Sequence, residues 1–197
     1  MYKNPCFDSS VFLGGLNGEI VEGVKRGVVY SYLLERARAG EFKIHIASVA
    51  IAEVFQSKTH GIQSGSPFLE DFMSLLEENL LEPIEVDREA GIKAHQLCRQ
   101  YVAVGLRPFD ALHVACAHAA ACDYLLTWDK RLTKVVVEQE RPLKIEAPRI
   151  YDRDLLTPSE IASPEEQAQW NINNKARRKV LGRDFHLEAM CSEGLGI

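Results

Sequence analysis

The sequence lacks the features that mark several common classes of protein. Its 197 residues contain no apolar run of membrane-spanning length, and the N-terminus lacks the basic and then apolar profile of a signal peptide. The five cysteines are odd in number and form no C-x-x-C pair. We therefore expect reduced thiols, a cytoplasmic setting and no membrane association. The absence of a G-x-S-x-G elbow and of a P-loop disfavours an α/β-hydrolase and an NTPase.

An excess of positive charge is also missing. The formal net charge is −5 at pH 7, so no global positive field indicates nucleic-acid binding. A nuclease stays open, because divalent cations bound at an acidic centre invert the local charge. The hydrophobic fraction of 46% and the charged fraction of 26% are those of an ordinary globular protein, which at this length predicts one domain and an appendage.

Short apolar segments alternate with segments of helical spacing as far as about residue 150. This alternation predicts an α/β domain over residues 1–150, built as a three-layer α/β/α sandwich with a mostly parallel central sheet. The first strand is expected to end near Asp8, with a turn after it because glycines follow. Further strands are expected at 42–46, 81–86, 123–129 and 143–145, and helices at 19–39, 49–58, 67–79, 88–104, 106–117 and 130–137.

The composition changes beyond Tyr151. Two helix-start signatures, Thr157-Pro-Ser-Glu and Ser163-Pro-Glu-Glu, and a polar segment at 167–180 predict a partly helical C-terminal extension over residues 151–197. Basic residues gather from Lys175 to Arg183. They are interpreted first as a solvated helix face and, as the alternative, as a stripe that contacts phosphates.

Carboxylates stand at the ends of several apolar stretches. Asp8 and Asp129 fall at predicted strand ends, Asp110 falls at a helix start, and Glu53 lies about one turn into a helix. Sites in parallel sheets form beyond the carboxyl ends of the strands, so all four acids could meet at one edge. Two simpler interpretations stay open: Asp110 could only stabilise its helix N-terminus, and Glu53 could face water.

Grouped carboxylates repel one another, and hard cations are a usual way to hold them together. Mg²⁺ or Mn²⁺ accepts a few carboxylate oxygens and keeps positions for water and a substrate phosphate. Such a centre can polarise a phosphodiester and lower the pKa of a bound water. Ser10 and Thr127 stand beside the acids and are candidates for orienting a ligand or a phosphate.

Four stretches contain these acids with their flanking residues: Phe7-Asp-Ser-Ser-Val-Phe-Leu, Ala47-Ser-Val-Ala-Ile-Ala-Glu-Val, Pro108-Phe-Asp-Ala-Leu-His-Val-Ala-Cys-Ala and Leu125-Leu-Thr-Trp-Asp-Lys. Together they resemble the PIN-domain family and, within it, the VapC-like ribonucleases. The resemblance implies a small three-layer nuclease that hydrolyses RNA with Mg²⁺ or Mn²⁺. Asp8, Glu53, Asp110 and Asp129 would be the metal-binding acids, with Thr127 and Ser10 as supporting polar groups. The resemblance also implies a cognate antitoxin and a homodimer as partners.

Two features depart from that family pattern. Trp128 stands where a small polar residue is usual, so its indole could pack, narrow the site or stack on a base. The extension is the second departure, since it is absent from the usual short toxin pattern. We expect structural or surface roles for His113 and His118, which are five residues apart on one helix.

Two other functions compete with the ribonuclease. The first is a catalytically silent PIN-like module that binds RNA or a protein partner, which the acidic charge, Trp128 and the extension favour. The second is a phosphotransferase with Asp8 as its nucleophile. The haloacid-dehalogenase pattern of such enzymes needs a second aspartate two residues on, and Ser10 stands there instead.

Overall fold

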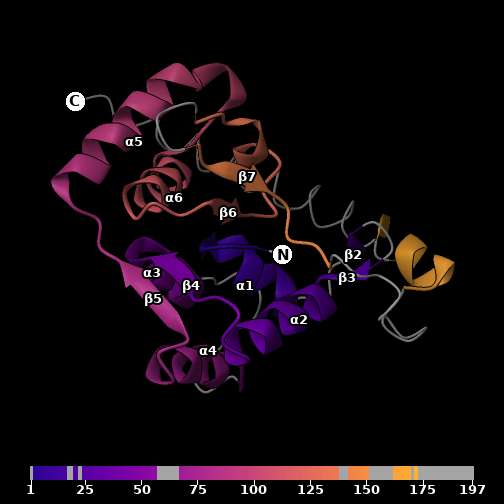
Figure 1. Ribbon diagram of the computed structural model, residues 1–197. Helices are drawn as coiled ribbons and strands as arrows, with labels where there is room; N and C mark the ends of the chain where they lie inside the picture. Colours follow the sequence, from indigo (N-terminus) through magenta and orange to yellow (C-terminus); the bar gives the residue numbers. More distant parts are fainter. Residues whose placement is uncertain are drawn as a thin grey trace, which may run out of the picture.

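A five-stranded parallel sheet forms the centre of the molecule (Figure 1). The computed structural model describes residues 2–16, 20–21, 24–56, 67–137, 142–150, 162–169 and 171–172. The strand order is β5-β4-β1-β6-β7, which places the first strand of the chain in the middle. The strands are β1 (Pro5–Phe7), β4 (Ile44–Ala47), β5 (Leu81–Ile84), β6 (Tyr124–Leu126) and β7 (Lys144–Glu146).

Side chains of the central strands alternate between two hydrophobic cores, as the pleat of a strand requires. Phe7 and Leu126 lie opposite each other in the register and enter one core, whereas Cys6 and Leu125 enter the other. Helices cover both faces, so the predicted three-layer sandwich is confirmed. The helices are α1 (Ser9–Leu16), α2 (Arg26–Arg38), α3 (Ser48–Gln56), α4 (Pro67–Glu77), α5 (Arg88–Gln100) and α6 (Pro108–Ala119).

The segment after β1 is a helix, α1, and the predicted turn is wrong. The glycines that suggested a turn instead permit close packing. A Cβ on Gly15 would lie 2.6 Å from Cγ of Tyr30, and one on Gly27 would lie 2.8 Å from the carbonyl oxygen of Gly15. Glycine is therefore needed where α1 and α2 meet, because a methyl group has no room there.

The predicted helix 19–39 is wrong in its first part. A short antiparallel pair, β2 (Ile20–Val21) and β3 (Val24–Lys25), precedes α2, which begins at Arg26. Ile20 and Val24 are four residues apart and imitate helical spacing, but both are buried from a two-stranded hairpin. Gly40, in the left-handed region at φ 77°, lies just past the end of α2, as expected from its freedom at positive φ.

Two helical predictions are longer than the structure. The helix expected at 88–104 ends as α5 at Gln100, and a short 3-10 turn, η2 (Val102–Val104), follows it. In the region 130–137 only the 3-10 turn η3 (Leu132–Lys134) is helical, and Val137 forms an antiparallel bridge with Leu143. The strand expected at 123–129 is β6 alone, so Thr127 and Asp129 lie beyond its end.

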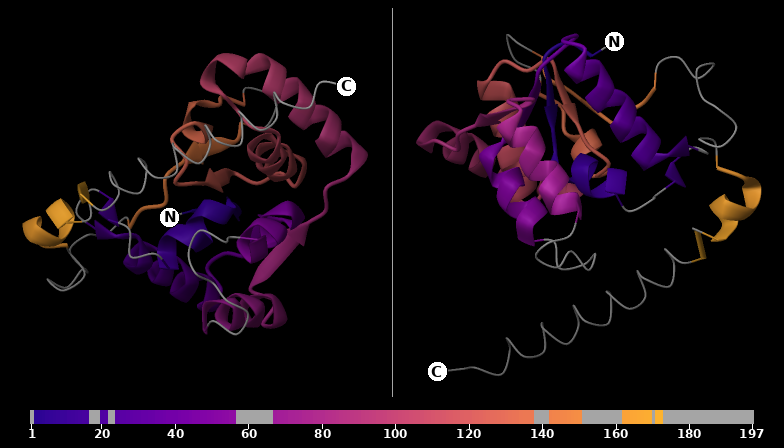
Figure 2. Two further views of the ribbon diagram at one scale, coloured as in Figure 1. Left: turned by 180° about the vertical axis from the view of Figure 1, so that it is seen from behind. Right: turned by 90° about the horizontal axis from the view of Figure 1, so that it is seen from below.

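Part of the C-terminal extension is described, and there the predicted helix start is confirmed. The Ser163 Oγ accepts from the Glu166 N–H at 3.1 Å, and a Glu166 carboxylate oxygen accepts from the Ser163 N–H at 2.9 Å. This is the reciprocal pattern of a capping box. Residues 164–169 are helical and lie beside β2 and β3 (Figure 2), where Lys25 binds Glu166 at 2.9 Å.

The remaining predictions for the extension lie outside the described residues. These are the Thr157 signature, the helix beyond residue 172 and the basic cluster from Lys175 to Arg183. Within the described part of the chain, no helix is both long and apolar enough to span a membrane.

Candidate metal centre

The acidic cluster lies at the carboxyl edge of the three middle strands. Asp8 directly follows β1, and its backbone N–H donates to the carbonyl of Leu126 in β6 at 3.0 Å. Thr127 directly follows β6, and Glu53 extends from α3, which begins immediately after β4. Asp8 is 5% exposed and Thr127 is fully buried. Adjacent parallel strands thus bring together residues that are more than 100 positions apart.

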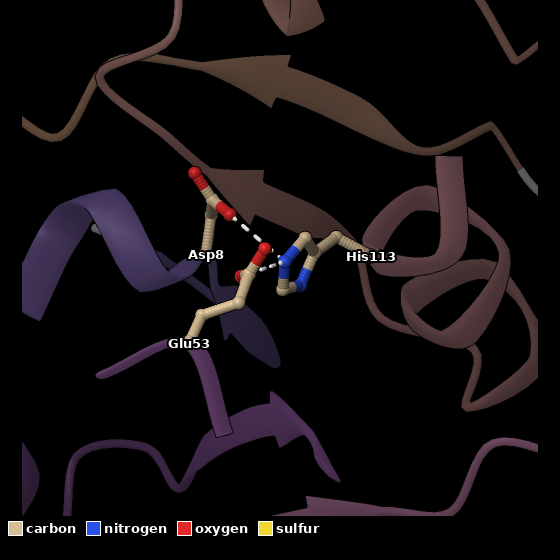
Figure 3. Close-up of side chains that lie close together, drawn as sticks. All are labelled: Asp8, Glu53 and His113. Atoms are coloured by element: carbon tan, nitrogen blue, oxygen red, sulfur yellow. Dashed lines mark hydrogen bonds and ion pairs between the residues drawn. The ribbon is translucent and has the colours of Figure 1, made fainter. Parts of the chain in front are cut away.

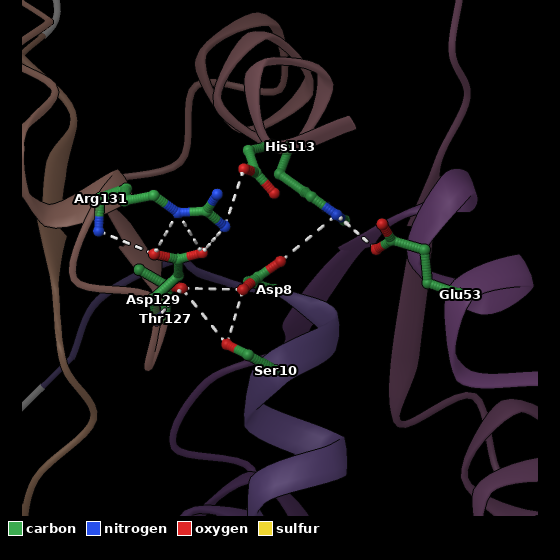
Figure 4. Close-up of polar contacts among 8 residues, drawn as sticks. Asp8, Ser10, Glu53, His113, Thr127, Asp129 and Arg131 are labelled. Atoms are coloured by element: carbon green, nitrogen blue, oxygen red, sulfur yellow. Dashed lines mark hydrogen bonds and ion pairs between the residues drawn. The ribbon is translucent and has the colours of Figure 1, made fainter. Parts of the chain in front are cut away.

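Two hydroxyl groups fix one oxygen of Asp8. The Oδ2 atom accepts from Ser10 at 2.6 Å and from Thr127 at 2.7 Å (Figure 4). Each hydroxyl oxygen also accepts a backbone N–H, from Trp128 at 2.9 Å and from Asp129 at 3.0 Å. Both hydroxyl protons are therefore directed at the carboxylate, and Asp8 is held with its Oδ1 atom on the other side.

His113 joins Asp8 to Glu53. Its Nε2 atom lies 2.8 Å from Oε2 of Glu53 and 3.3 Å from Oδ1 of Asp8 (Figure 3). Burial opposes charge on both residues, but their mutual interaction outweighs it. The hydrogen bond and charge of His113 lower the pKa of Glu53, and the carboxylates of Asp8 and Glu53 raise the pKa of His113. The three side chains therefore form an ion-paired unit in which Asp8 and His113 are buried and Glu53 is partly exposed.

The sequence predicted a structural or surface role for His113, and it did not predict the contacts with Asp8 and Glu53. The informative spacing is that between Asp110 and His113, not that between His113 and His118. Asp110 and His113 are three residues apart on α6, and residues at this spacing share a helix face. An acid at the start of the helix and a histidine one turn later thus point toward the same edge of the sheet.

Asp110 and Asp129 lie around Arg131 in the other half of the cluster. Nε of Arg131 donates to both oxygens of Asp129 at 3.1 Å, and Nη2 contacts Oδ2. The same Nη2 atom lies 3.5 Å from Oδ2 of Asp110. Burial opposes ionisation of Asp129, but the Arg131 hydrogen bonds outweigh it and lower the pKa of Asp129. Burial, together with the charges of Asp129 and Asp8, raises the pKa of Asp110 despite Arg131.

All six predicted site residues therefore gather at one edge, in two halves. Asp8, Glu53 and His113 each offer a ligand atom within 4.8 Å of the other two, which is the spacing of a metal-binding group. Oδ2 of Asp110 is buried and has no hydrogen-bond partner among the described residues. Carboxylate oxygens and an imidazole nitrogen are both common ligands of divalent ions in proteins. The residues present fit a divalent ion.

Trp128 packs beside this cluster. Its indole joins the core that contains Phe12, and the guanidinium of Arg26 lies 4.5 Å from the ring centre. A Cβ on Gly14 would lie 2.8 Å from Cδ1 of the indole. Of the three interpretations from the sequence, the structure supports packing, with one face of the ring covered by Arg26.

Fold and site together define an α/β domain with an acidic centre at the carboxyl edge of a parallel sheet. A sequence model of the PIN domain matches residues 6–138, which is more than half of the chain. The chain therefore belongs to the PIN domain family. No curated protein gives a significant match to it.

Several solved structures are similar to this chain. VapBC-5 from Mycobacterium tuberculosis, a member of the VapBC family of toxin-antitoxin systems, is 16% identical with a TM-score of 0.45, over 73% of this chain and 98% of that one. VapBC2 from Rickettsia felis, bound to a promoter DNA fragment, is 21% identical with a TM-score of 0.48, over 73% and 97%. PAE2754 from Pyrobaculum aerophilum is 16% identical with a TM-score of 0.44, over 74% and 90%.

Proposed function

We propose that this protein is a Mg²⁺- or Mn²⁺-dependent endoribonuclease that hydrolyses RNA phosphodiester bonds. The observation that carries the proposal is the convergence of Asp8, Glu53, Asp110 and Asp129, from four separate segments, on one edge of the sheet. PIN domains are generally nucleases, and membership of that family supports the same conclusion. These four acids are the proposed catalytic and metal-binding set.

The chain's own residues divide the work at such a centre. Ser10 and Thr127 hold Oδ2 of Asp8 and so direct its other oxygen toward Glu53 and His113. A bound divalent ion would supply Lewis acidity and lower the pKa of a water molecule. The acids would hold the ion in place of the His113 contact, because a carboxylate binds a divalent ion more strongly than a single positive charge.

Exposed groups next to Asp110 support an RNA substrate. Arg107 and Phe109 both lie on the surface at the start of α6, and Phe109 is 55% exposed. A guanidinium can contact a phosphate, and an exposed ring can stack on an unpaired base. Single-stranded RNA presents a phosphate and an unpaired base at each nucleotide, so the surface around Arg107 and Phe109 suits this substrate.

The partner part of the proposal rests on the resemblance to VapC-like toxins. A cognate antitoxin would cover the acidic edge and block the substrate, and two copies of the chain would form a homodimer. Sedimentation equilibrium of the purified chain measures the second statement directly, and a monomer at micromolar concentration would contradict it.

Substitution of Asp110 tests the nuclease. Asp110→Asn keeps the size of the side chain and removes its charge, so we expect cleavage of RNA in Mg²⁺ to fall about 100-fold or more while the fold persists. Asp71→Asn on the exposed side of α4 is the matched control and should cleave normally. Cleavage by the Asp110→Asn protein at the rate of the parent would overturn the assignment.

The second candidate is a PIN-like module that binds RNA or a protein partner without cleavage. The feature that favours it is that His113 and Arg131 already neutralise acids in both halves of the cluster. Titration with Mn²⁺ separates the two functions. A nuclease shows saturable binding that Asp8→Asn abolishes, whereas a silent module shows neither this binding nor metal-dependent turnover.

A further inference from the structure

Arg131 connects two of the acids by a geometry that resembles metal bridging. Its Nε donates to both Asp129 oxygens, its backbone N–H donates to Oδ1 at 2.7 Å, and its Nη2 contacts Oδ2 (Figure 4). Nη2 also lies 3.5 Å from Oδ2 of Asp110. A single cationic group thus contacts two carboxylates that come from different elements, as the second ion of a two-metal site does.

We propose that Arg131 is the resident cation of the Asp110–Asp129 half, in the place of a second divalent ion, so that this centre binds one divalent ion. The inference rests on the proposed metal-dependent function and specifies how many ions the centre takes. Of the four acids proposed to form the metal-binding set, Asp129 then acts through Arg131 as a positioning residue and is not itself a ligand of the ion. Asp8 and Glu53 hold the ion, and Asp110 lies between the two halves.

The charges of the cluster favour one ion over two. The four carboxylates carry four negative charges, and the guanidinium, which stays protonated in proteins, cancels one of them. The sum over the four carboxylates, the guanidinium and one divalent ion is a single negative charge, whereas a second divalent ion would make this sum positive. The second ion would also have to displace a guanidinium that donates to both oxygens of Asp129.

The backbone around Arg131 holds this arrangement in place. Asp129 and Arg131 are joined by a tight turn in which the Asp129 carboxylate accepts the Arg131 N–H. The next residue, Leu132, is fully buried in the core on the α6 side of the sheet. The Arg131 side chain is 34% exposed, but the turn and the buried Leu132 hold its backbone in place. The ion pair of Arg131 with Asp129 therefore forms within a short local segment of the chain.

The two acids of this half differ in the capacity that remains for a metal. Both oxygens of Asp129 accept hydrogen bonds from Arg131. Oδ2 of Asp110 is buried and has no hydrogen-bond partner among the described residues, and its contact with Arg131 is long at 3.5 Å. Asp110 is therefore the acid that can turn toward an ion held by Asp8 and Glu53.

Counting bound Mn²⁺ on the full chain tests the inference. Isothermal titration calorimetry and electron paramagnetic resonance should give one ion for the unsubstituted protein. Arg131→Gln should give two, because it leaves Asp110 and Asp129 without a cation. Arg131→Lys retains the charge and should bind one. Arg149→Gln removes a guanidinium that pairs with Glu146 outside the cluster, and as the matched control it should also bind one.

The outcomes distinguish the role proposed for Arg131 from the proposed metal-dependent function. Two ions on the unsubstituted protein would overturn the role of Arg131, and this count does not depend on the folding of any variant. One ion on folded Arg131→Gln would overturn it as well. Failure of the proposed function is different: the unsubstituted chain would bind no Mn²⁺ saturably, or Asp8→Asn would bind it equally well.

Discussion

The two halves of the acidic cluster contain the same kinds of group but are neutralised in different ways. Asp8 and Glu53 contact the imidazole of His113, which is 1% exposed and can lose its proton. Asp110 and Asp129 contact the guanidinium of Arg131, which keeps its proton and is 34% exposed. Similar carboxylate pairs can therefore be neutralised by different cations. His113 can lose its proton, so the Asp8–Glu53 half can bind a metal ion instead. Arg131 keeps its charge, so the Asp110–Asp129 half does not need a metal ion.

The largest expected effect is on the half that contains His113. His113→Ala should destabilise the metal-free protein by about 3 kcal/mol at pH 5.5, because it leaves two carboxylates at a buried position without their cation. The histidine pKa is raised from 6.5, so its stabilisation is fully present below pH 6.5 and is lost as pH rises through the folded value. Urea unfolding in EDTA at pH 5.5 and 8.5 should show a smaller cost at the higher pH.

The acid of the pair sets the lower limit of this window. The pKa of Glu53 is lowered from 4.5, so its contribution is present above pH 4.5 and is lost as pH falls through the folded value. Two controls sharpen the contrast. The cost of Arg131→Gln should change less between pH 5.5 and 8.5 than that of His113→Ala, because Arg131 stays charged and the pKa of Asp129 is lowered. Burial lowers the pKa of His118, so the cost of His118→Ala should change with pH in the opposite direction to that of His113→Ala. A cost of His113→Ala that does not vary with pH would contradict the ion pair.

The sequence was sufficient for the acids of both halves and insufficient for the two cations that contact them. The strand ends identified Asp8 and Asp129, and the order of apolar segments predicted the parallel sheet that brings them together. His113 escaped because its partners lie 60 residues or more away and only the packing of α6 against β1 and α3 reveals them. The sequence did not identify Arg131, because its importance comes from side-chain geometry and a charged residue in a predicted helix gives no such signal.

The prediction of local structure was wrong where one residue type or spacing is compatible with two kinds of structure. Glycines commonly mark turns, but Gly14 and Gly15 lie inside α1 because Trp128 and Tyr30 approach too closely for a Cβ. The hairpin β2–β3 failed for a related reason, since the i, i+4 spacing of Ile20 and Val24 is shared by two kinds of structure. Tertiary packing decides such cases, and a single sequence does not display it.

A second prediction tests whether that close packing matters to the half of the cluster that α1 supports. Gly15→Ala would place a Cβ 2.6 Å from Cγ of Tyr30, so either Tyr30 or α1, the helix that contains Ser10, must shift. We expect a loss of about 1–3 kcal/mol in unfolding free energy. Gly91→Ala is the matched control. Gly91 lies on the exposed side of α5, where an added Cβ would contact no other part of the protein within 4 Å. This substitution should raise the unfolding free energy by up to about 1 kcal/mol. Equal effects of both substitutions in urea unfolding would refute the packing argument.

The smallest effect is expected at an exposed ion pair, which gives the baseline for the two buried halves. Glu166 caps its helix through Ser163 and binds Lys25 at 2.9 Å, and these contacts lower its pKa. Since the pair is solvent-exposed, salt and water weaken it. Glu166→Ala should leave the global stability nearly unchanged but should speed amide hydrogen exchange in residues 164–169. Glu165→Ala, exposed one position earlier, should not. If Glu166→Ala destabilised the whole domain as strongly as His113→Ala, burial would not be what distinguishes these two ion pairs, and the cost expected for His113→Ala would lose its physical basis.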